Sequence, residues 1–134
     1  MSGIDFREIQ AMPPLYVRLT HSKKKVRKWH REFGADVYSL EKHFKKNGAF
    51  TTTFEREDGE TVHIVWMTDC TDYPAACDAA LLAHEATHIA QDYFRSIGEA
   101  SPSDELQAYT VQHVTDYLVG NHFDWKQKQF DKGK

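Results

Sequence analysis

The stretch AALLAHEATHIAQDYF, residues 79–94, decides how the second half of the chain folds. It is rich in alanine and leucine, contains no proline or glycine, and places apolar residues three and four positions apart, which predicts a helix. We expect this helix from about 75 to 97, because Pro74 favours a break before it and Gly98 can end it.

A second long helix is expected to follow the first. Ser103 is in position to cap its first turn, where Asp104 and Glu105 complement the helix dipole. We expect this helix to end near Gly120, and the remaining residues, 121–134, either to dock on the body of the protein or to fray.

Before these helices the apolar pattern changes to a period of two. Asp58-Gly59, a pair that tolerates the positive φ of a tight turn, separates two runs with high strand propensity. The sequence therefore predicts a β-hairpin with strands at about 49–57 and 60–68, followed by a loop over 68–74.

The N-terminal part is expected to hold a short strand and one or two helices. Alternating apolar and polar residues predict the strand over 14–20. Ser22 and Gly34 are in position to begin and end a helix. The segment 36–47 is ambiguous, and we favour a helix there because its apolar residues share one face.

Together these elements predict an α+β fold, with a small antiparallel sheet that contains the β-hairpin, and a pair of long helices. The chain of 134 residues fits one globular domain, and no apolar run approaches the ~20 residues that span a bilayer. Within this domain we distinguish a basic N-terminal region, the hairpin, the helix pair and the tail, at 1–48, 49–68, 75–120 and 121–134.

The sequence also predicts a cytoplasmic protein. Residues 1–14 lack the basic segment and apolar run of a signal peptide. Cys70 and Cys77 do not make a disulfide framework, so we expect both to be reduced thiols.

At the centre of the first long helix, His84, Glu85 and His88 form the pattern H-E-x-x-H. Residues four apart on a helix lie one turn apart on the same face, so both imidazoles can reach one Zn²⁺. Glu85 can approach from the side and take a proton from a water whose pKa the zinc lowers to about 7. The alternative is an amphipathic helix with two core histidines and no metal.

A catalytic zinc takes three protein ligands and one open position, so we expect a third ligand from the second helix. Glu105 is favoured, because it begins a stripe that we expect to face the first helix beside the metal. The other members of this stripe are Ala108, Tyr109, Gln112, His113 and Asp116. The opposite stripe, expected to be ordinary core, contains Leu106, Val114 and Leu118. The weaker candidates for the third ligand are Asp92, Glu99, Asp104 and His113.

The segments HEATH (84–88) and ELQAY (105–109) resemble the gluzincin class of zinc metallopeptidases. The resemblance implies a zincin-like domain in which the two histidines and Glu105 hold one zinc per chain, with Glu85 as general base. It also implies that a protein or peptide substrate lies along an edge strand of the sheet. The natural candidate for that strand is VHIVWM, 62–67.

The whole arrangement, with IGEASPSDELQAYTVQ (97–112) after the motif, is also similar to short, uncharacterised metallopeptidase-like proteins of bacteriophages and prophages, and the specific match covers residues 80–112. That similarity implies a place in the cytoplasm of a bacterial host, or in a virion. In gluzincins an acidic residue often follows the ligand glutamate by four positions, and here Tyr109 stands there. Asp116 or a backbone carbonyl is then the candidate for orienting a ligand histidine, and Tyr109 and His113 are the candidates for stabilising the transition state.

The segment KKKVRKWHR, 23–31, contains six lysines and arginines. Residues 1–50 carry a net charge of +6, whereas residues 51–134 carry −9. Such a helix fits a nucleic acid or an acidic protein partner, and SprT-like proteases do combine H-E-x-x-H with DNA binding. The simpler alternative is a solvated helix face.

These observations lead to three hypotheses. The first is a zinc metallopeptidase, a hydrolase that cleaves a specific protein target with Glu85 as general base. The second is a non-catalytic structural or interaction protein, virion-associated if the phage resemblance holds, that keeps a zincin core for stability. The third is a SprT-like, DNA-associated protease that is recruited through the basic helix.

Overall fold

The computed structural model describes residues 4, 6–9, 14–99 and 101–133, so residues 1–14, examined above for a signal peptide, lie partly outside the described residues. Along the chain, the elements are β1 (Arg7–Ile9), β2 (Leu15–Thr20), α1 (Lys23–Glu32), α2 (Tyr38–Lys46), β3 (Ala49–Glu55), β4 (Thr61–Met67), α3 (Ala75–Ser96) and α4 (Asp104–Lys132).

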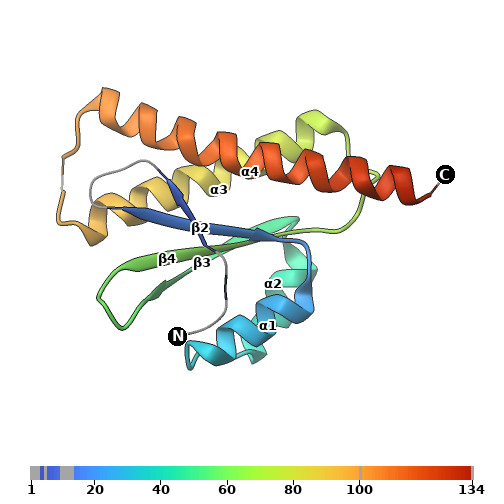
Figure 1. Cartoon of the computed structure of the whole chain (residues 1–134), viewed down its shortest axis with the longest axis horizontal. Coiled ribbons are helices and arrows are strands. Elements are labelled where there is room, and N and C mark those ends of the chain that lie inside the picture. The colour runs from blue at the N-terminus through green and yellow to red at the C-terminus, as the bar shows by residue number, and fades with distance from the viewer. Residues whose placement is uncertain (1–3, 5, 10–13, 100, 134) are drawn as a thin grey trace.

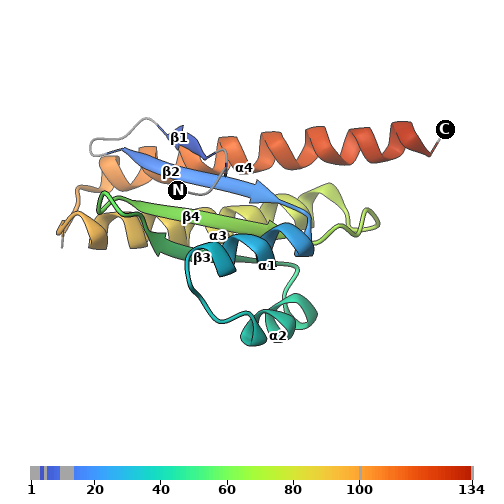
Figure 2. The ribbon, with the colours of Figure 1, turned by 60° about the horizontal axis from the view of Figure 1, so that its bottom comes forward.

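The elements form three layers, with the sheet in the middle (Figures 1 and 2). The strand order in the sheet is β1-β2-β4-β3. The long helices α3 and α4 run in opposite directions across one face of the sheet, and α1 and α2 lie on the other side (Figure 1). The C-terminal part of α4 extends past the end of the sheet (Figure 1).

The α+β prediction is confirmed, but the sheet is mixed rather than antiparallel. The pairs β1–β2 and β3–β4 are antiparallel, whereas β2 and β4 are parallel, with Tyr16 opposite Val62. The chain leaves β2, passes through α1, α2 and β3, and returns to the central position as β4. This long crossover makes the central pair parallel, since parallel neighbours need such a connection.

The predicted boundary signals account for most element ends. The hydroxyl oxygens of Ser22 and Ser103 each accept a hydrogen bond from a backbone N–H in the first turn of α1 and α4, at 3.1 Å in both cases. Gly59 turns the hairpin with φ of 87°, and Gly98 follows the end of α3 with φ of 76°. A side chain at either glycine would be strained in this left-handed region.

The predicted end of the last helix at Gly120 is wrong, and of the two alternatives for residues 121–134 the described ones dock on the body, as part of α4. α4 continues past Gly120 almost to the end of the described chain. Its buried face there carries the polar residues His122 and Lys126, which both bind Asp78 of α3, so the sequence shows no apolar stripe. Neither α4 nor any other described helix is long and apolar enough to cross a membrane.

The sheet buries side chains on both of its faces, and this decides which strand lies at the edge. β4 alternates between a core toward α3 and α4, which contains Val65 and Met67, and a core toward α1 and α2, which contains Trp66. The prediction that 62–67 forms an edge strand is wrong, because β4 lies between β2 and β3. Its nearly continuous apolar run is typical of a strand that is covered on both faces.

Candidate metal site

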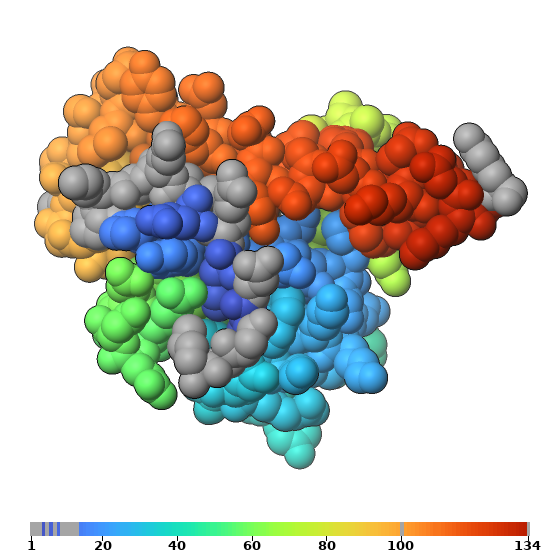
Figure 3. Space-filling model, in the orientation of Figure 1, coloured from blue at the N-terminus to red at the C-terminus, as the bar shows by residue number. Residues whose placement is uncertain are grey.

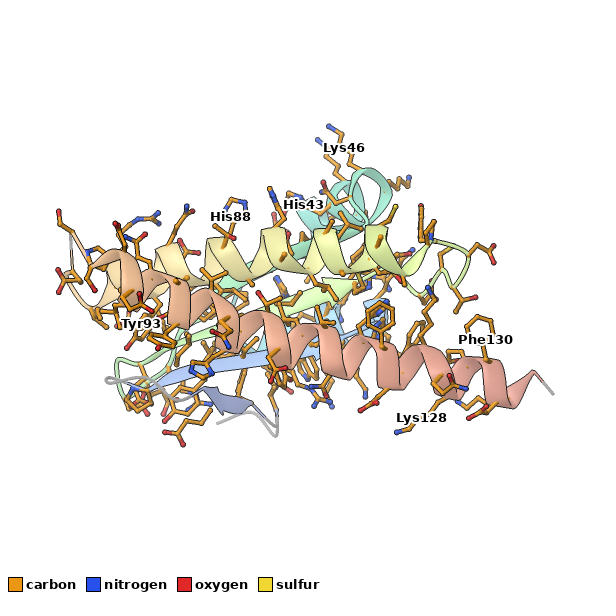
Figure 4. The ribbon with its side chains drawn as sticks, turned by 90° about the horizontal axis from the view of Figure 1, so that it is seen from above. His43, Lys46, His88, Tyr93, Lys128 and Phe130 are labelled. Atoms are coloured by element: carbon orange, nitrogen blue, oxygen red, sulfur yellow. The ribbon has the colours of Figure 1, made fainter. Side chains whose placement is uncertain are left out.

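The residues of the H-E-x-x-H motif lie near the middle of α3, and helical periodicity decides where each side chain points. Leu82, Ala86 and Ile89 are buried in the core, whereas His84 and His88 are exposed one turn apart. The Nε2 atoms of these histidines are 3.0 Å apart, with the ring planes at 82°. His88 leaves α3 on the side away from α4 (Figure 4). The alternative of two core histidines is therefore wrong.

The two imidazoles fit two positions of a tetrahedral metal ion. Two nitrogens that each lie ~2.0–2.1 Å from one Zn²⁺ in tetrahedral geometry are about 3.3 Å apart. The Nε2 atoms of His84 and His88 are already at 3.0 Å, where one Nε2–H donates to the other Nε2. The observed separation is thus about 0.3 Å shorter than the separation of two zinc ligands.

The histidine pair faces an open cavity of about 990 Å³ that lies between α3, β3 and the end of α2. His84, Glu85, His88 and Asp92 line it from α3, and Lys46, Phe50 and Thr51 line it from α2 and β3. β3 is the last strand of the described sheet, so its outer backbone edge has no strand partner among the described residues. Such an edge can accept an extended peptide as an additional strand.

Glu85 is buried between α3 and the sheet, with 6% of its surface exposed. Its Oε1 accepts a hydrogen bond from the hydroxyl of Thr51 on β3 at 3.1 Å. Because a buried carboxylate needs such a donor, Thr51 both stabilises Glu85 and fixes its position beside the histidine pair.

A second threonine of β3 holds the next carboxylate along the cavity. The hydroxyl of Thr53 donates to Oδ2 of Asp92 at 3.3 Å and lies 2.9 Å from Nδ1 of His63. Burial lowers the pKa of His63 to about 4, although the Asp92 carboxylate opposes the shift. A neutral His63 that donates its Nδ1–H to Thr53 leaves Nε2 as an unpaired acceptor, as is observed.

The stripe of α4 that was predicted to face α3 points to solvent. Its members Glu105, Ala108, Tyr109, Gln112, His113 and Asp116 are all exposed. α4 packs through Val114 and Leu118, as predicted, and through Thr110, whereas Leu106, which was also predicted as core, is 46% exposed. The buried positions follow a strict four-residue spacing from Thr110 to Lys126, so this stripe, and not the stripe that begins at Glu105, packs against the rest of the protein.

The structure therefore does not bring Glu105 to the histidine pair. The described residues contain no group of three His, Cys, Asp or Glu side chains placed to hold one metal ion. Of the weaker candidates, Asp92 lines the cavity, and none of the described residues of α4 does. The rings of Tyr109 and His113 stack on each other on the exposed side of α4, with centroids 6.5 Å apart.

The sequence interpretation did not identify Thr51, Thr53 or His63 as parts of the site. In the sequence the threonines read as ordinary strand residues, since threonine has high strand propensity. A detectable signal was that Thr51 and Thr53 share one face of a strand while Glu85 and Asp92, seven residues apart, share one face of a helix. That signal becomes useful only when the strand and helix are known to be neighbours.

The two cysteines are free, as predicted, and Cys77 is exposed in the lining of the cavity.

Comparison with protein-family models, with curated protein sequences and with solved structures gives no match for this chain. The resemblance to gluzincins therefore depends on the segments HEATH (84–88) and ELQAY (105–109) alone. The feature of the structure that bears on function is the arrangement of His84, Glu85 and His88 beside the open edge of β3.

Proposed function

We propose that this protein is a zinc-dependent hydrolase that cleaves a peptide bond in a protein target at the cavity beside α3. One observation carries the proposal: two exposed imidazoles converge to 3.0 Å directly beside a carboxylate that is 6% exposed and hydrogen-bonded. An exposed pair of histidines contributes little to the core, so stability alone gives no reason for this arrangement.

The side chains have distinct roles in this proposal. His84 and His88 hold the metal through Nε2, and bound Zn²⁺ supplies a Lewis acid that polarises a carbonyl and makes water more acidic. Glu85 takes the proton of the attacking water and delivers it to the leaving amine. Thr51 keeps the Glu85 carboxylate aimed into the cavity throughout.

The position of β3 favours an extended protein segment as substrate. Its open backbone edge borders the same cavity, so a segment paired with β3 passes in front of the two histidines and Glu85. This role was predicted for 62–67, and β3 replaces it here because β4 is enclosed. A pairing of this kind requires the target to be locally unfolded at the cleavage site.

Glu105 is the third ligand that the gluzincin resemblance implies, and it can act only if the first turn of α4 moves. It is exposed on α4, and His88 points to the other side of α3. The zinc content of the Glu105→Ala variant decides whether Glu105 is a ligand. Loss of zinc in Glu105→Ala would show that metal binding draws this turn toward the histidines. Retained zinc would leave His84 and His88 as the protein ligands identified in this cavity.

The test combines elemental mass spectrometry for zinc with hydrolysis of fluorescently labelled, unfolded casein. We expect one zinc per chain in the wild type and in Glu85→Gln, and loss of most of it in His88→Ala. Casein cleavage should occur only in the wild type. A wild type that remains metal-free after zinc is offered would refute the proposal. Zinc bound by the wild type without any cleavage across a panel of unfolded proteins would favour the non-catalytic alternative.

A further inference from the structure

The helices α1 and α2 concentrate positive charge on the side of the sheet away from α3 and α4. Residues 21–47 contain nine lysines and arginines against three aspartates and glutamates, a net +6, whereas the whole chain carries −3. The sequence interpretation considered α1 alone. α2 adds Lys42, Lys45 and Lys46 next to it, so the charge extends over two helices.

The two helices are held side by side by contacts that leave most of this charge free. Nε of Arg27 lies 2.7 Å from Oε1 of Glu41, which neutralises one of the three acidic groups. The Arg27 guanidinium and the Lys23 ammonium also lie over the ring of Phe44, at 5.3 and 5.6 Å from its centroid. These contacts use the inner cations and fix the relative position of α1 and α2.

The outward cations form two rows at helical spacing. Lys24, Lys28 and Arg31 lie at i, i+4 and i+7 on α1, and Lys42, Lys45 and Lys46 lie on α2; all six are exposed. We call these six residues the α1–α2 basic surface. In Figure 3 the light-blue and cyan atoms of α1 and of the segment after it form the lower part of the molecule, and α2 lies largely behind them.

The surface offers charge but almost no apolar area. Val26, Trp29, Leu40 and Phe44 are buried beneath it, and the only large hydrophobic residue of α1 and α2 that is strongly exposed is Tyr38, at 86%. Protein interfaces depend on buried aromatic and aliphatic anchors, whereas binding to a phosphate backbone depends on cations. We propose that the α1–α2 basic surface binds the phosphate backbone of a nucleic acid.

The dimensions of the surface fit a short stretch of duplex. Ten helical residues extend ~15 Å, and duplex DNA carries one charge per ~1.7 Å, so one side of the duplex presents on the order of five phosphates over this length. Lys46 belongs both to this surface and to the lining of the histidine cavity. It projects on the same side of α3 as His88 (Figure 4). A protein bound to the same nucleic acid would therefore lie close to the cavity, but the inference does not depend on the proposed hydrolase activity.

The test is fluorescence anisotropy with a labelled 20-base-pair DNA duplex, a 20-nucleotide single strand and a polyglutamate peptide of similar charge. About five phosphate contacts predict that affinity for the duplex falls by on the order of 500-fold between 50 and 200 mM salt. The variant Lys28→Ala/Lys42→Ala should reduce the slope of log affinity against log salt by about 2 and weaken binding about tenfold or more at 100 mM salt. Arg95→Ala/Lys132→Ala removes the same charge from exposed positions on α3 and α4 and is the matched control.

Each outcome decides for or against the proposal. The proposal is supported if the duplex or the single strand binds to the wild type and to the control variant but not to the surface variant. The DNA probe that binds more tightly then identifies the form of nucleic acid. The proposal is overturned if neither strand binds at 50 mM salt, or if the control weakens binding as much as the surface variant. Tighter binding of polyglutamate than of both DNA probes would overturn it in favour of an acidic protein partner.

Discussion

Asp78 should be the most sensitive polar residue of the fold. It is fully buried on α3, and its Oδ2 accepts hydrogen bonds from Nζ of Lys126 and Nε2 of His122 on α4, each at 2.8 Å. Nδ1 of His122 then accepts from Nε2 of His21 at 2.9 Å, and the ring of His21 stacks on Trp125 at 3.7 Å. This chain of contacts joins α3, the C-terminal half of α4 and the segment between β2 and α1.

The substitution Asp78→Ala leaves Lys126, which is 8% exposed, without a counter-charge. Removing one partner of a buried ion pair typically costs about 3–5 kcal/mol. With an unfolding entropy of about 2.1 cal/mol/K per residue, a chain of 134 residues should lose about 10–18 °C in Tm. This is a large part of the about 5–15 kcal/mol that stabilises a typical domain.

The assay is thermal and urea unfolding, followed by circular dichroism at pH 7, of Asp78→Ala, Lys126→Met and the double variant. The double variant should be more stable than Asp78→Ala alone, because it contains no unpaired buried ammonium group. The reasoning is refuted if Asp78→Ala stays within about 1 kcal/mol of the wild type, or if the two single losses simply add.

The same network predicts how stability depends on acid. Burial alone would raise the pKa of Asp78, but the hydrogen bonds from Lys126 and His122 outweigh it and hold the pKa below its usual range. The contribution of Asp78 is therefore present above its unfolded pKa of about 3.9 and is lost as the pH falls further. Burial lowers the pKa of His21 to about 3, an effect that His122 strengthens and Asp78 opposes. His21 should thus destabilise the fold progressively from pH 6.5 downward, before Asp78 is protonated.

Three further predictions test the site and the core. Burial lowers the pKa of His63 to about 4, so the unfolded chain binds the proton first as the pH falls, and His63 should reduce the free energy of unfolding of the wild type by up to about 3 kcal/mol between pH 6.5 and 4. Urea titrations at these two pH values should show a smaller loss of stability in His63→Gln, and equal losses would contradict this. Thr51→Val should lower kcat/KM about tenfold with unchanged zinc content, and Thr51→Ser should recover most of it, if the hydroxyl positions Glu85 as general base. Leu118→Ala should lower the free energy of unfolding in urea by about 2–5 kcal/mol, whereas Leu106→Ala, at a 46% exposed position, should lower it by under about 1 kcal/mol. Similar losses in the two variants would show that both leucines belong to the core.

The elements that sequence reasoning predicted well are those with local signals. Ser22, Gly59 and Ser103 act through contacts within a few residues, so their roles can be recognised without knowing the fold. The second half of α4 has no such signal. Its anchors, His122 and Lys126, are polar residues whose partner lies more than 40 positions earlier in the chain, and they look like surface residues until that partner is known.

The residues of the candidate site also divide into those that a local sequence signal reveals and those that it does not. His84, Glu85 and His88 were identified because their spacing within one helix already determines that they are neighbours. The orientation of α4, on which the choice of Glu105 depended, is set instead by which of its stripes packs more favourably against α3 and the sheet. Val114 and Leu118 of the buried stripe were predicted as core from their spacing, but that spacing does not show that the Glu105 stripe turns away from α3.

The register of β3 links the fold to the proposed chemistry. Thr51 and Thr53 pair with Val65 and His63 of β4 and face α3, while the intervening Thr52 faces the other way and contacts His30 of α1. A slip of one residue would turn both donors away from α3 and leave the carboxylates of the cavity without them. The same strand is the open edge beside the histidine pair. Positioning of the general base and access for an extended substrate thus both depend on β3, and the hydrolase proposal depends on this strand at least as much as on a third metal ligand from α4.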